Sequence, residues 1–169
     1  MIYYNINEMD TFKVLIAQRN YRICAIILGQ SKVQLLNELA GYFNDEIFQE
    51  RDKNLMDIKV IEQFLNPSKN EMLSIPLEMN GTDLQKKIWI FLRNTDVGET
   101  FTYKEIAKEI GKDEKSSRVI ANACAANRFA LIIPCHRVLS SNGKGSGYKW
   151  GKELKELLLL KEKIIAQKM

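Results

Sequence analysis

The spacing of apolar residues along the chain predicts strands at the N-terminus and helices after them. Two runs rich in β-branched and aromatic residues, 11–17 and 22–28, flank a polar turn at 18–21. Apolar positions then recur every three or four residues over 33–43 and 56–65. Because alternation is typical of strands and a period near 3.6 is typical of amphipathic helices, the pattern predicts a small sheet followed by two helices.

The segment 66–81 contains two prolines and ends in a glycine, and the apolar pattern changes after it. Since both residue types interrupt regular structure, the segment is predicted to be an extended connection. We therefore place a domain boundary there. Residues 1–80 are expected to form an α/β domain, a small sheet with helices, together with the linker, and residues 81–169 a mostly α domain.

The second half of the chain is dominated by helical patterns. Two capping boxes, in which a threonine precedes Gln or Glu by three residues, predict helices over 83–93 and 103–110. Gly111 is expected to end the second of these, and the polar turn 112–115 leads to a third helix over 116–126. An apolar run, a glycine-rich loop and a C-terminal helix follow.

A helix, a four-residue turn and a second helix have the spacing of a helix-turn-helix motif. In the second helix, Val119, Ile120 and Ala123 are expected to pack inward. The opposite face, expected to contact DNA, then carries Arg118, Ala121, Asn122 and Ala125. Such small residues allow close approach to DNA but read few bases, which favours shape or minor-groove recognition. An ordinary helical hairpin fits the same pattern.

The net charge of +4 is unevenly distributed along the chain. Residues 1–80 hold 8 Lys and Arg against 11 Asp and Glu, whereas residues 81–169 hold 17 against 10. A basic half attracts polyanions such as nucleic acid, although solvated lysine-rich helices give the same signal. The charge therefore makes the C-terminal half the candidate nucleic-acid surface.

The chain has no run of eighteen apolar residues and no basic leader followed by an apolar stretch. We therefore expect no membrane partner and no signal peptide. The three cysteines have no regular spacing, and their odd number leaves at least one free thiol. A reducing, cytoplasmic location is expected.

Cys135 is followed directly by His136, the only histidine in the chain. A thiol must become a thiolate before it attacks carbon, and a nearby imidazole can take its proton. Neighbouring side chains on a strand point apart, so the proton needs a turn after Pro134 or a bridging water. Glu162 or Glu156 on the last helix could orient the imidazole. A buried, unreactive cysteine beside a core histidine fits these residues as well.

Two other kinds of cysteine site are excluded. Structural zinc needs four Cys or His ligands at paired spacings, and this chain has four such residues in total, of which two are adjacent. No metal site is therefore predicted. A cysteine protease carries its histidine far from the thiol in sequence. Cys24, in a strand-like run, and Cys124, on the inner side of a helix, are expected to be structural.

Several separated motifs carry a resemblance to a known family. The sequence Ile-Pro-Cys-His-Arg-Val stands at 133–138, Cys-Ala-Ala-Asn at 124–127 and Gly-Tyr-Lys-Trp-Gly at 147–151. With these in register are Thr82, Gln85, Trp89, Gly98, Glu99, Tyr103, Ile106, Ala107 and Arg118. From 81 to about 162 the chain resembles the O6-alkylguanine-DNA alkyltransferases (methylated-DNA–protein-cysteine methyltransferases). Its motifs are closest to the C-terminal domain of the bacterial adaptive-response (Ada-type) protein.

The resemblance implies repair of DNA by irreversible transfer of a methyl or other alkyl group from O6-alkylguanine to Cys135. O4-methylthymine is the second substrate to consider. Because a thioether does not readily leave, each molecule would act once, without a cofactor. The implied partner is double-stranded DNA containing alkylated guanine, bound by a monomer. The alternative is a non-catalytic module that only binds alkylated DNA, although relatives of that kind lack the acceptor cysteine.

The resemblance also implies roles for individual residues. His136 would act as the base through a bound water, with Glu162 polarising its ring, and Asn127 would hydrogen-bond within the hinge before the active-site loop. Tyr103 would contact DNA and stabilise the guanine oxygen as the base leaves. Arg118 would enter the duplex and fill the space of the flipped nucleotide. The walls of the guanine pocket would come from Tyr148, Gly147, Ser146, Gly145 and Lys149.

The chain departs from the family pattern at three places. The turn at 112–117 is one residue longer, which bears on the tilt of Arg118. The step 128–130 lacks the family's proline, and Lys149 stands where many members have a small residue, so both bear on tolerance of bulky adducts. Residues 1–80 resemble the family only in general architecture, a ribonuclease-H-like domain without zinc ligands. The second domain is expected to be winged-helix-like around its helix-turn-helix.

Overall fold

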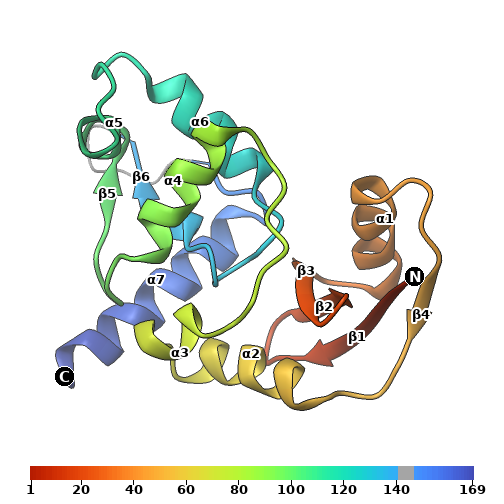
Figure 1. Ribbon diagram of the computed structural model, residues 1–169. Helices are drawn as coiled ribbons and strands as arrows, with labels where there is room; N and C mark the ends of the chain where they lie inside the picture. Colours follow the sequence, from red (N-terminus) through yellow and green to blue (C-terminus); the bar gives the residue numbers. More distant parts are fainter. Residues whose placement is uncertain (141–146) are drawn as a thin grey trace.

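The computed structural model describes residues 1–140 and 147–169 of the chain. A small sheet with helices comes first, and a group of helices follows it (Figure 1). The predicted fold class, α/β in the first half and mostly α in the second, is confirmed. No helix within the described ranges is both long and apolar enough to cross a bilayer. Gly145 and Ser146, predicted to wall the pocket, lie outside the described residues.

The sheet has the strand order β3-β2-β1-β4. Its members are β1 (Ile2–Glu8), β2 (Lys13–Arg19), β3 (Arg22–Gly29) and β4 (Phe48–Glu50). The first three pair antiparallel, and β4 runs parallel to β1. The turn between β2 and β3 holds Asn20 and Tyr21 at φ of 51° and 61°. Two such residues form the mirror-image turn that suits the twist of a hairpin. The predicted strands are confirmed with ends shifted by one or two residues.

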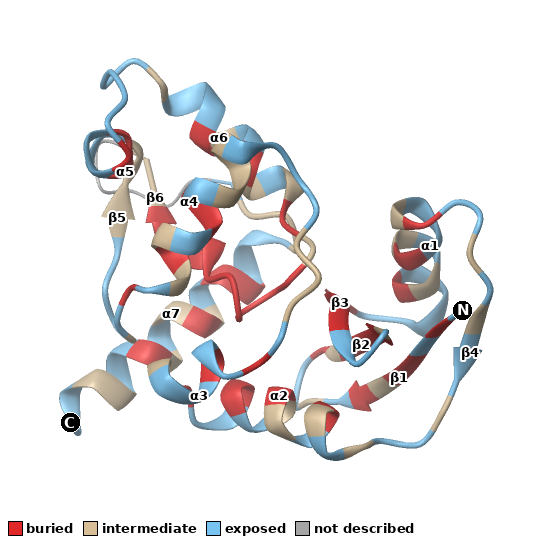
Figure 2. Cartoon of the chain, in the orientation of Figure 1, coloured by how far each residue is buried: buried red, intermediate tan, exposed pale blue. Residues whose placement is uncertain are grey.

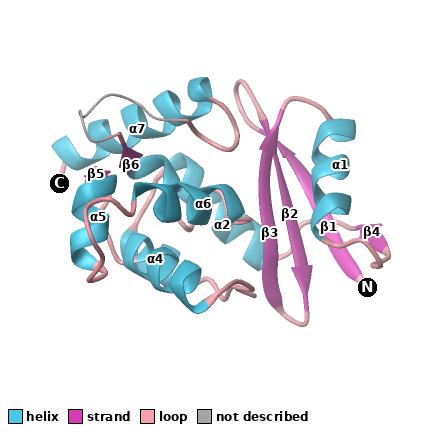
Figure 3. Cartoon of the chain, turned by 90° about the horizontal axis from the view of Figure 1, so that it is seen from above, coloured by secondary structure: helices cyan, strands magenta, loops and turns pink. Residues whose placement is uncertain are grey.

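Alternate residues of the strands enter two different cores, because successive side chains point to opposite faces. Leu15 and Ile27 pack against α1 (Lys32–Tyr42). Val14 and Ile26 face the other way and join the core that contains the C-terminal helices. In Figure 3, α1 lies beside the β1 and β4 end of the sheet, and the C-terminal helices lie on the β3 side. The buried segments of both halves meet beside β3 (Figure 2).

The helix α2 (Leu55–Leu65) begins at a capping box formed by Asn54 and Asp57. The prediction of a fully extended connection after it is wrong, because a short helix, α3 (Lys69–Leu73), lies there. The buried side chain of Met72 anchors that turn, and Arg93 donates to the carbonyls of Met72 and Ile75. The packing of Met72 thus stabilises a helical turn, although Pro67 and Pro76 on either side of it favour extended structure. The later part of the connection does run extended beside β3.

The C-terminal helices begin and end as their sequences predict. They are α4 (Asp83–Arg93), α5 (Tyr103–Glu109), α6 (Ser117–Ala126) and α7 (Lys152–Gln167). Both predicted capping boxes are present, and Gly111, at a φ of 75°, follows the end of α5. In α6, Ile120 and Ala123 are buried, but Val119 is 37% exposed, so its predicted inward position is wrong. The buried stripe of α6 is narrow, and Val119 lies about 100° around the helix from Ile120.

A buried segment joins α6 to the reactive motif and is fastened to the edge of the first sheet. The backbone N–H of Ile26 in β3 donates to the carbonyl of Arg128 at 2.8 Å, and the N–H of Ala130 donates back to Ile26 at 3.0 Å. The chain then forms a 3-10 turn, η1 (Cys135–Arg137), and the short strand β6 (Val138–Leu139), which pairs with β5 (Phe101–Thr102). These two hydrogen bonds therefore fix the position, relative to the sheet, of the segment that leads into Cys135.

Candidate active site

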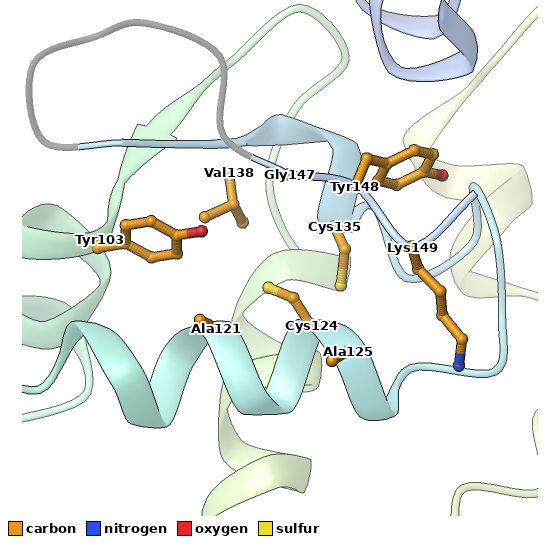
Figure 4. A pocket seen from close by; sticks show the side chains of 9 residues that line it. All are labelled: Tyr103, Ala121, Cys124, Ala125, Cys135, Val138, Gly147, Tyr148 and Lys149. Atoms are coloured by element: carbon orange, nitrogen blue, oxygen red, sulfur yellow. The ribbon is translucent and has the colours of Figure 1, made fainter. Parts of the chain in front are cut away.

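A cavity of about 400 Å³ lies between α6 and the turn that carries Cys135 (Figure 4). Its floor is α6, which contributes Ala121 and Ala125 with Cys124 between them. Cys135 faces this helix from the opposite wall, and Tyr103 stands at one end. Volumes of this size are typical of small-molecule sites. Alanines on the floor leave a slot without bulky projections.

The other end of the cavity is formed by the chain just before α7. Gly147, Tyr148 and Lys149 line it there. The Tyr148 hydroxyl is buried and has no hydrogen-bond partner within the described ranges, and the Tyr148 ring meets the His136 ring edge-on at 6.5 Å between centroids. Three of the five residues predicted to form the pocket walls therefore line this cavity.

The thiol of Cys135 is almost completely buried, with 5% of the residue exposed. Its Sγ accepts a hydrogen bond from Asn127 Nδ2 at 3.2 Å. A hydrogen bond to Cys124 and burial raise the pKa of Cys135, whereas the Asn127 amide and the positive charge of Lys149 act in the opposite direction. The cysteine is consequently a neutral thiol in the free protein near pH 7. A group that removes its proton is needed before it can attack carbon.

His136 lies in the same 3-10 turn and is fully buried. Its Nε2 is 2.8 Å from Oε1 of Glu162 on α7. A carboxylate can only accept here, so Nε2 carries the hydrogen and Nδ1 keeps its lone pair. Nδ1 is buried without a hydrogen-bond partner among the described residues. The ring is thus held in the tautomer that can take up a proton at Nδ1.

Glu162 also receives three hydrogen bonds from Arg137, at 2.9 and 3.2 Å from Nε and at 2.8 Å from Nη2. Burial alone would raise the pKa of Glu162, but its electrostatic and hydrogen-bond interactions with His136 and Arg137 lower it to about 2. Arg137 is itself held by Thr95, whose hydroxyl accepts from Nη1 at 2.8 Å. Glu156, the other candidate on this helix, is exposed and 3.9 Å from Lys152, so it does not orient the imidazole.

Asn127 ends α6 and is fully buried. Its Oδ1 accepts from the N–H of Phe129 at 2.8 Å, and its Nδ2 donates to the carbonyl of Ile133 at 3.0 Å as well as to Cys135. Between these partners Leu131 adopts a φ of 70°, a conformation that is unfavourable for a residue with a side chain. The hydrogen bonds of Asn127 therefore hold a strained loop whose end places the thiol.

Lys149 links the cavity to the first half of the chain. Its ammonium group donates to the carbonyl of Asn127 at 2.8 Å and lies 4.6 Å from the ring centre of Tyr42 on α1. Burial lowers the pKa of Lys149 to about 8. Glu38, one turn earlier on α1, accepts from the Tyr42 hydroxyl at 2.6 Å and from Trp150 Nε1 at 2.9 Å. Sequence reasoning missed Tyr42 and Glu38, because nothing local marks a helix surface that another segment covers.

Four of the residues predicted to contact DNA lie on α6. Arg118, Asn122 and Ala125 are exposed, and Ala121 is half-buried at the cavity floor. The prediction that Cys24 packs in a core is confirmed. Cys124 also packs against the core as predicted, and its partly buried side chain points into the cavity toward Cys135 (Figure 4).

Comparison with known proteins agrees with this arrangement. Residues 83–164 match the family described as 6-O-methylguanine DNA methyltransferase, DNA binding domain. A methylated-DNA–protein-cysteine methyltransferase from Candida albicans is 36% identical over 96% of this chain and 97% of its own length. The bifunctional transcriptional activator/DNA repair enzyme Ada of Escherichia coli is 37% identical over 94% of this chain, which spans only 45% of Ada.

Solved structures share the fold over almost the whole chain. The O6-methylguanine-DNA methyltransferase from Pyrococcus kodakaraensis superposes with a TM-score of 0.77 at 22% identity, over 96% of this chain and 99% of that one. The O6-methylguanine methyltransferase of Mycobacterium tuberculosis gives 0.74 at 24% identity, over 97% and 94%. These structures show the shared fold, and the 36% identity to the Candida relative over almost the whole length of both chains shows that the chain belongs to the methylated-DNA–protein-cysteine methyltransferase family.

Proposed function

We propose that Cys135 is the alkyl acceptor with which this protein repairs O6-alkylguanine in DNA. The observation that carries this proposal is the position of its thiol. The sulfur lies on the wall of a cavity of about 400 Å³ and accepts a hydrogen bond from Asn127. The next residue in the chain is a histidine whose ring is oriented by a buried carboxylate. A structural cysteine needs neither a cavity nor an oriented base, so the arrangement favours a reactive thiol.

The reaction follows from these groups. His136 Nδ1 takes the proton of Cys135, through a bridging water, while Glu162 stabilises the imidazolium that forms. The thiolate sulfur attacks the alkyl carbon in line with the bond to guanine O6. The S–C bond forms as the C–O bond breaks, and the electron pair of that bond stays on guanine, which is then protonated. A thioether remains on the protein, so each molecule reacts once and needs no cofactor.

Tyr103 stands at the end of the cavity, with its hydroxyl directed toward the interior (Figure 4). We assign it the donation of a hydrogen bond to guanine oxygen as negative charge develops there. Tyr148, Gly147 and Lys149 enclose the base from the other end. A planar purine between these ends presents its alkyl group to Cys135.

Delivery of the base requires that it leave the duplex, because an O6 atom within the stack cannot reach a buried sulfur. Arg118 is exposed at the start of α6, and the small residues Ala121 and Ala125 farther along this helix line the cavity, with Asn122 exposed between them in sequence. Insertion of Arg118 would fill the space of the flipped nucleotide. A solved structural neighbour, the Mycobacterium tuberculosis protein, is described in complex with DNA. We therefore propose double-stranded DNA as the partner, bound by a monomer in the cytoplasm.

Transfer is tested by incubating the protein with duplex DNA that carries one O6-methylguanine and weighing the intact protein. We expect a gain of one methyl mass per molecule, on the peptide that contains Cys135, and no gain for Cys135→Ala. The matched variant Cys24→Ala, altered in a distant core, should be methylated like the wild type. DNA binding in a gel shift without any methyl gain would favour the non-catalytic module instead. The same assay with O4-methylthymine establishes the second substrate.

A further inference from the structure

The cavity contains a second thiol that the transfer reaction does not use. Cys124 comes from the last turn of α6 and Cys135 from the 3-10 turn, and their sulfurs face each other across the cavity (Figure 4). Each thiol shifts the pKa of the other: Cys135 lowers that of Cys124, and Cys124 raises that of Cys135. Two cysteines that are eleven residues apart in sequence thus line the same cavity, which small molecules can enter.

The two thiols of the pair differ in their electrostatic surroundings, which favour the thiolate of Cys124. Lys155 on α7 is buried and donates to the carbonyl of Val138 at 2.6 Å. The hydrogen bond with Cys135 lowers the pKa of Cys124, burial opposes this effect, and the positive charge of Lys155 adds to the lowering. The amide of Asn127 points at the sulfur of Cys135. The thiolate of Cys124 is therefore stabilised by Cys135 and by Lys155, whereas Cys135, whose pKa is raised, reacts as a thiolate only after His136 takes its proton.

The third cysteine lacks all of these features. Cys24 is 1% exposed in the core between the first sheet and α1, away from the cavity. Burial raises its pKa to about 12. It is therefore an internal reference for a thiol that should not react.

We propose that Cys124 is a resolving cysteine, which captures Cys135 in a reversible disulfide when a peroxide oxidises the site. This rests on the proposed role of Cys135 as the alkyl acceptor. In the first step the thiolate of Cys135 attacks one oxygen of hydrogen peroxide. An S–O bond forms, the O–O bond breaks and hydroxide leaves, so sulfur is oxidised to sulfenic acid while the peroxide is reduced.

In the second step the thiolate of Cys124 attacks the sulfur of the sulfenic acid. The S–S bond forms, the S–O bond breaks, and the departing hydroxide takes a proton to become water. Overall, two thiols and one peroxide give a disulfide and two waters. A dithiol reductant reopens the bond by exchange and is itself oxidised to a disulfide.

This pairing matters because each molecule has a single acceptor sulfur. Further oxidation of a sulfenic acid to sulfinic or sulfonic acid is not reversed by thiols and would remove the molecule from repair. The disulfide stops oxidation at a stage that can be reversed. A molecule that has already been alkylated has a thioether in place of the Cys135 thiol and cannot enter the cycle.

The test uses the full chain, hydrogen peroxide and no DNA at the oxidation stage. Protein is treated with peroxide, free thiols are blocked after denaturation, and peptides are weighed. We expect the loss of two hydrogen masses and a link between Cys124 and Cys135, with Cys24 still free. After dithiothreitol, methyl transfer should return to most of the activity of the untreated protein.

Replacement of Cys124 separates resolution from transfer. Peroxide should leave Cys124→Ala and Cys124→Ser with two or three added oxygens on Cys135, and dithiothreitol should restore little of each variant's own untreated activity. Cys24→Ala should recover as the wild type does. Recovery of both Cys124 variants to the wild-type extent, or peroxide-treated wild type without the link, overturns the proposal. Failure of untreated wild type to accept a methyl group refutes the proposed function instead, and the peptide masses still decide whether the disulfide forms.

Discussion

Glu162→Gln tests whether the buried carboxylate orients the catalytic histidine. The substitution keeps the size of the side chain but removes the charge that accepts from His136 Nε2 at 2.8 Å and from Arg137 at 2.8 and 2.9 Å. Arg137 is 1% exposed, so it would be left in the core without its counter-charge. Removing one partner of a buried ion pair typically costs about 3–5 kcal/mol.

The pKa of Glu162 gives a second measure of the same interaction. A fall from the ordinary value of 4.5 to about 2 corresponds to roughly 3 kcal/mol in favour of the ionised carboxylate in the folded state. Because the folded pKa is the lower one, this stabilisation is complete above about pH 4.5 and is lost as the pH falls toward 2. We therefore expect Glu162→Gln to lower the unfolding free energy by about 3 kcal/mol at pH 7, and by much less near pH 2.5.

Urea denaturation at the two pH values and single-turnover methyl transfer at pH 7 are the assays. Without the carboxylate the tautomer and angle of the imidazole are free to vary, so transfer should slow by roughly a hundredfold, the lower range for a general base. Glu156→Gln is the matched control, since Glu156 lies on the same helix but is exposed and only 3.9 Å from Lys152. A Glu162→Gln protein as stable and as fast as Glu156→Gln would refute the assigned network.

Three further substitutions address other parts of the site. Asn127→Ala removes three hydrogen bonds from a buried loop, so we expect urea denaturation to show a loss of about 2–3 kcal/mol in unfolding free energy. Methyl transfer by the folded fraction should also be slower than in the wild type. Full activity of the folded variant would contradict this. Lys149→Met removes a charge that lowers the pKa of Cys135, so the rise of the transfer rate with pH should move to higher pH, whereas the exposed Lys152→Met should leave the profile in place. Arg118→Ala should slow transfer from duplex DNA more than from a free base analogue, and equal losses on both would exclude a role in flipping.

Local sequence signals predict secondary structure correctly where the interactions that stabilise it lie within a few residues. The boxes Thr82–Gln85 and Thr102–Glu105 start helices as predicted, because the bonds that cap them lie within four residues. The three-residue strand β4 was not predicted, since its only support is the pairing with β1. The short helix α3 was missed for a similar reason.

The site was predictable in its residues but not in its connections. Sequence left Glu162 and Glu156 as alternatives, because both lie on one amphipathic helix and only its docking decides which faces the histidine. Cys124 packs against the core as predicted, but nothing in its spacing indicates that it also lines the cavity. The contact between Lys149 and Tyr42 joins residues more than a hundred positions apart, and no spacing rule indicates it.

That contact ties the first half of the chain to the wall of the cavity, although none of the predicted site residues lies in that half. The backbone of Ile26 is hydrogen-bonded to residues 128–130, which lead into Cys135. The ring of Tyr42 on α1 contacts two cations, Arg128 at 4.8 Å from the ring centre and Lys149. The loop between them is strained at Leu131, so it needs such external support to keep one conformation. The sheet and α1 therefore act as the rigid frame against which a buried thiol is positioned, and the chemistry of the C-terminal half depends on them.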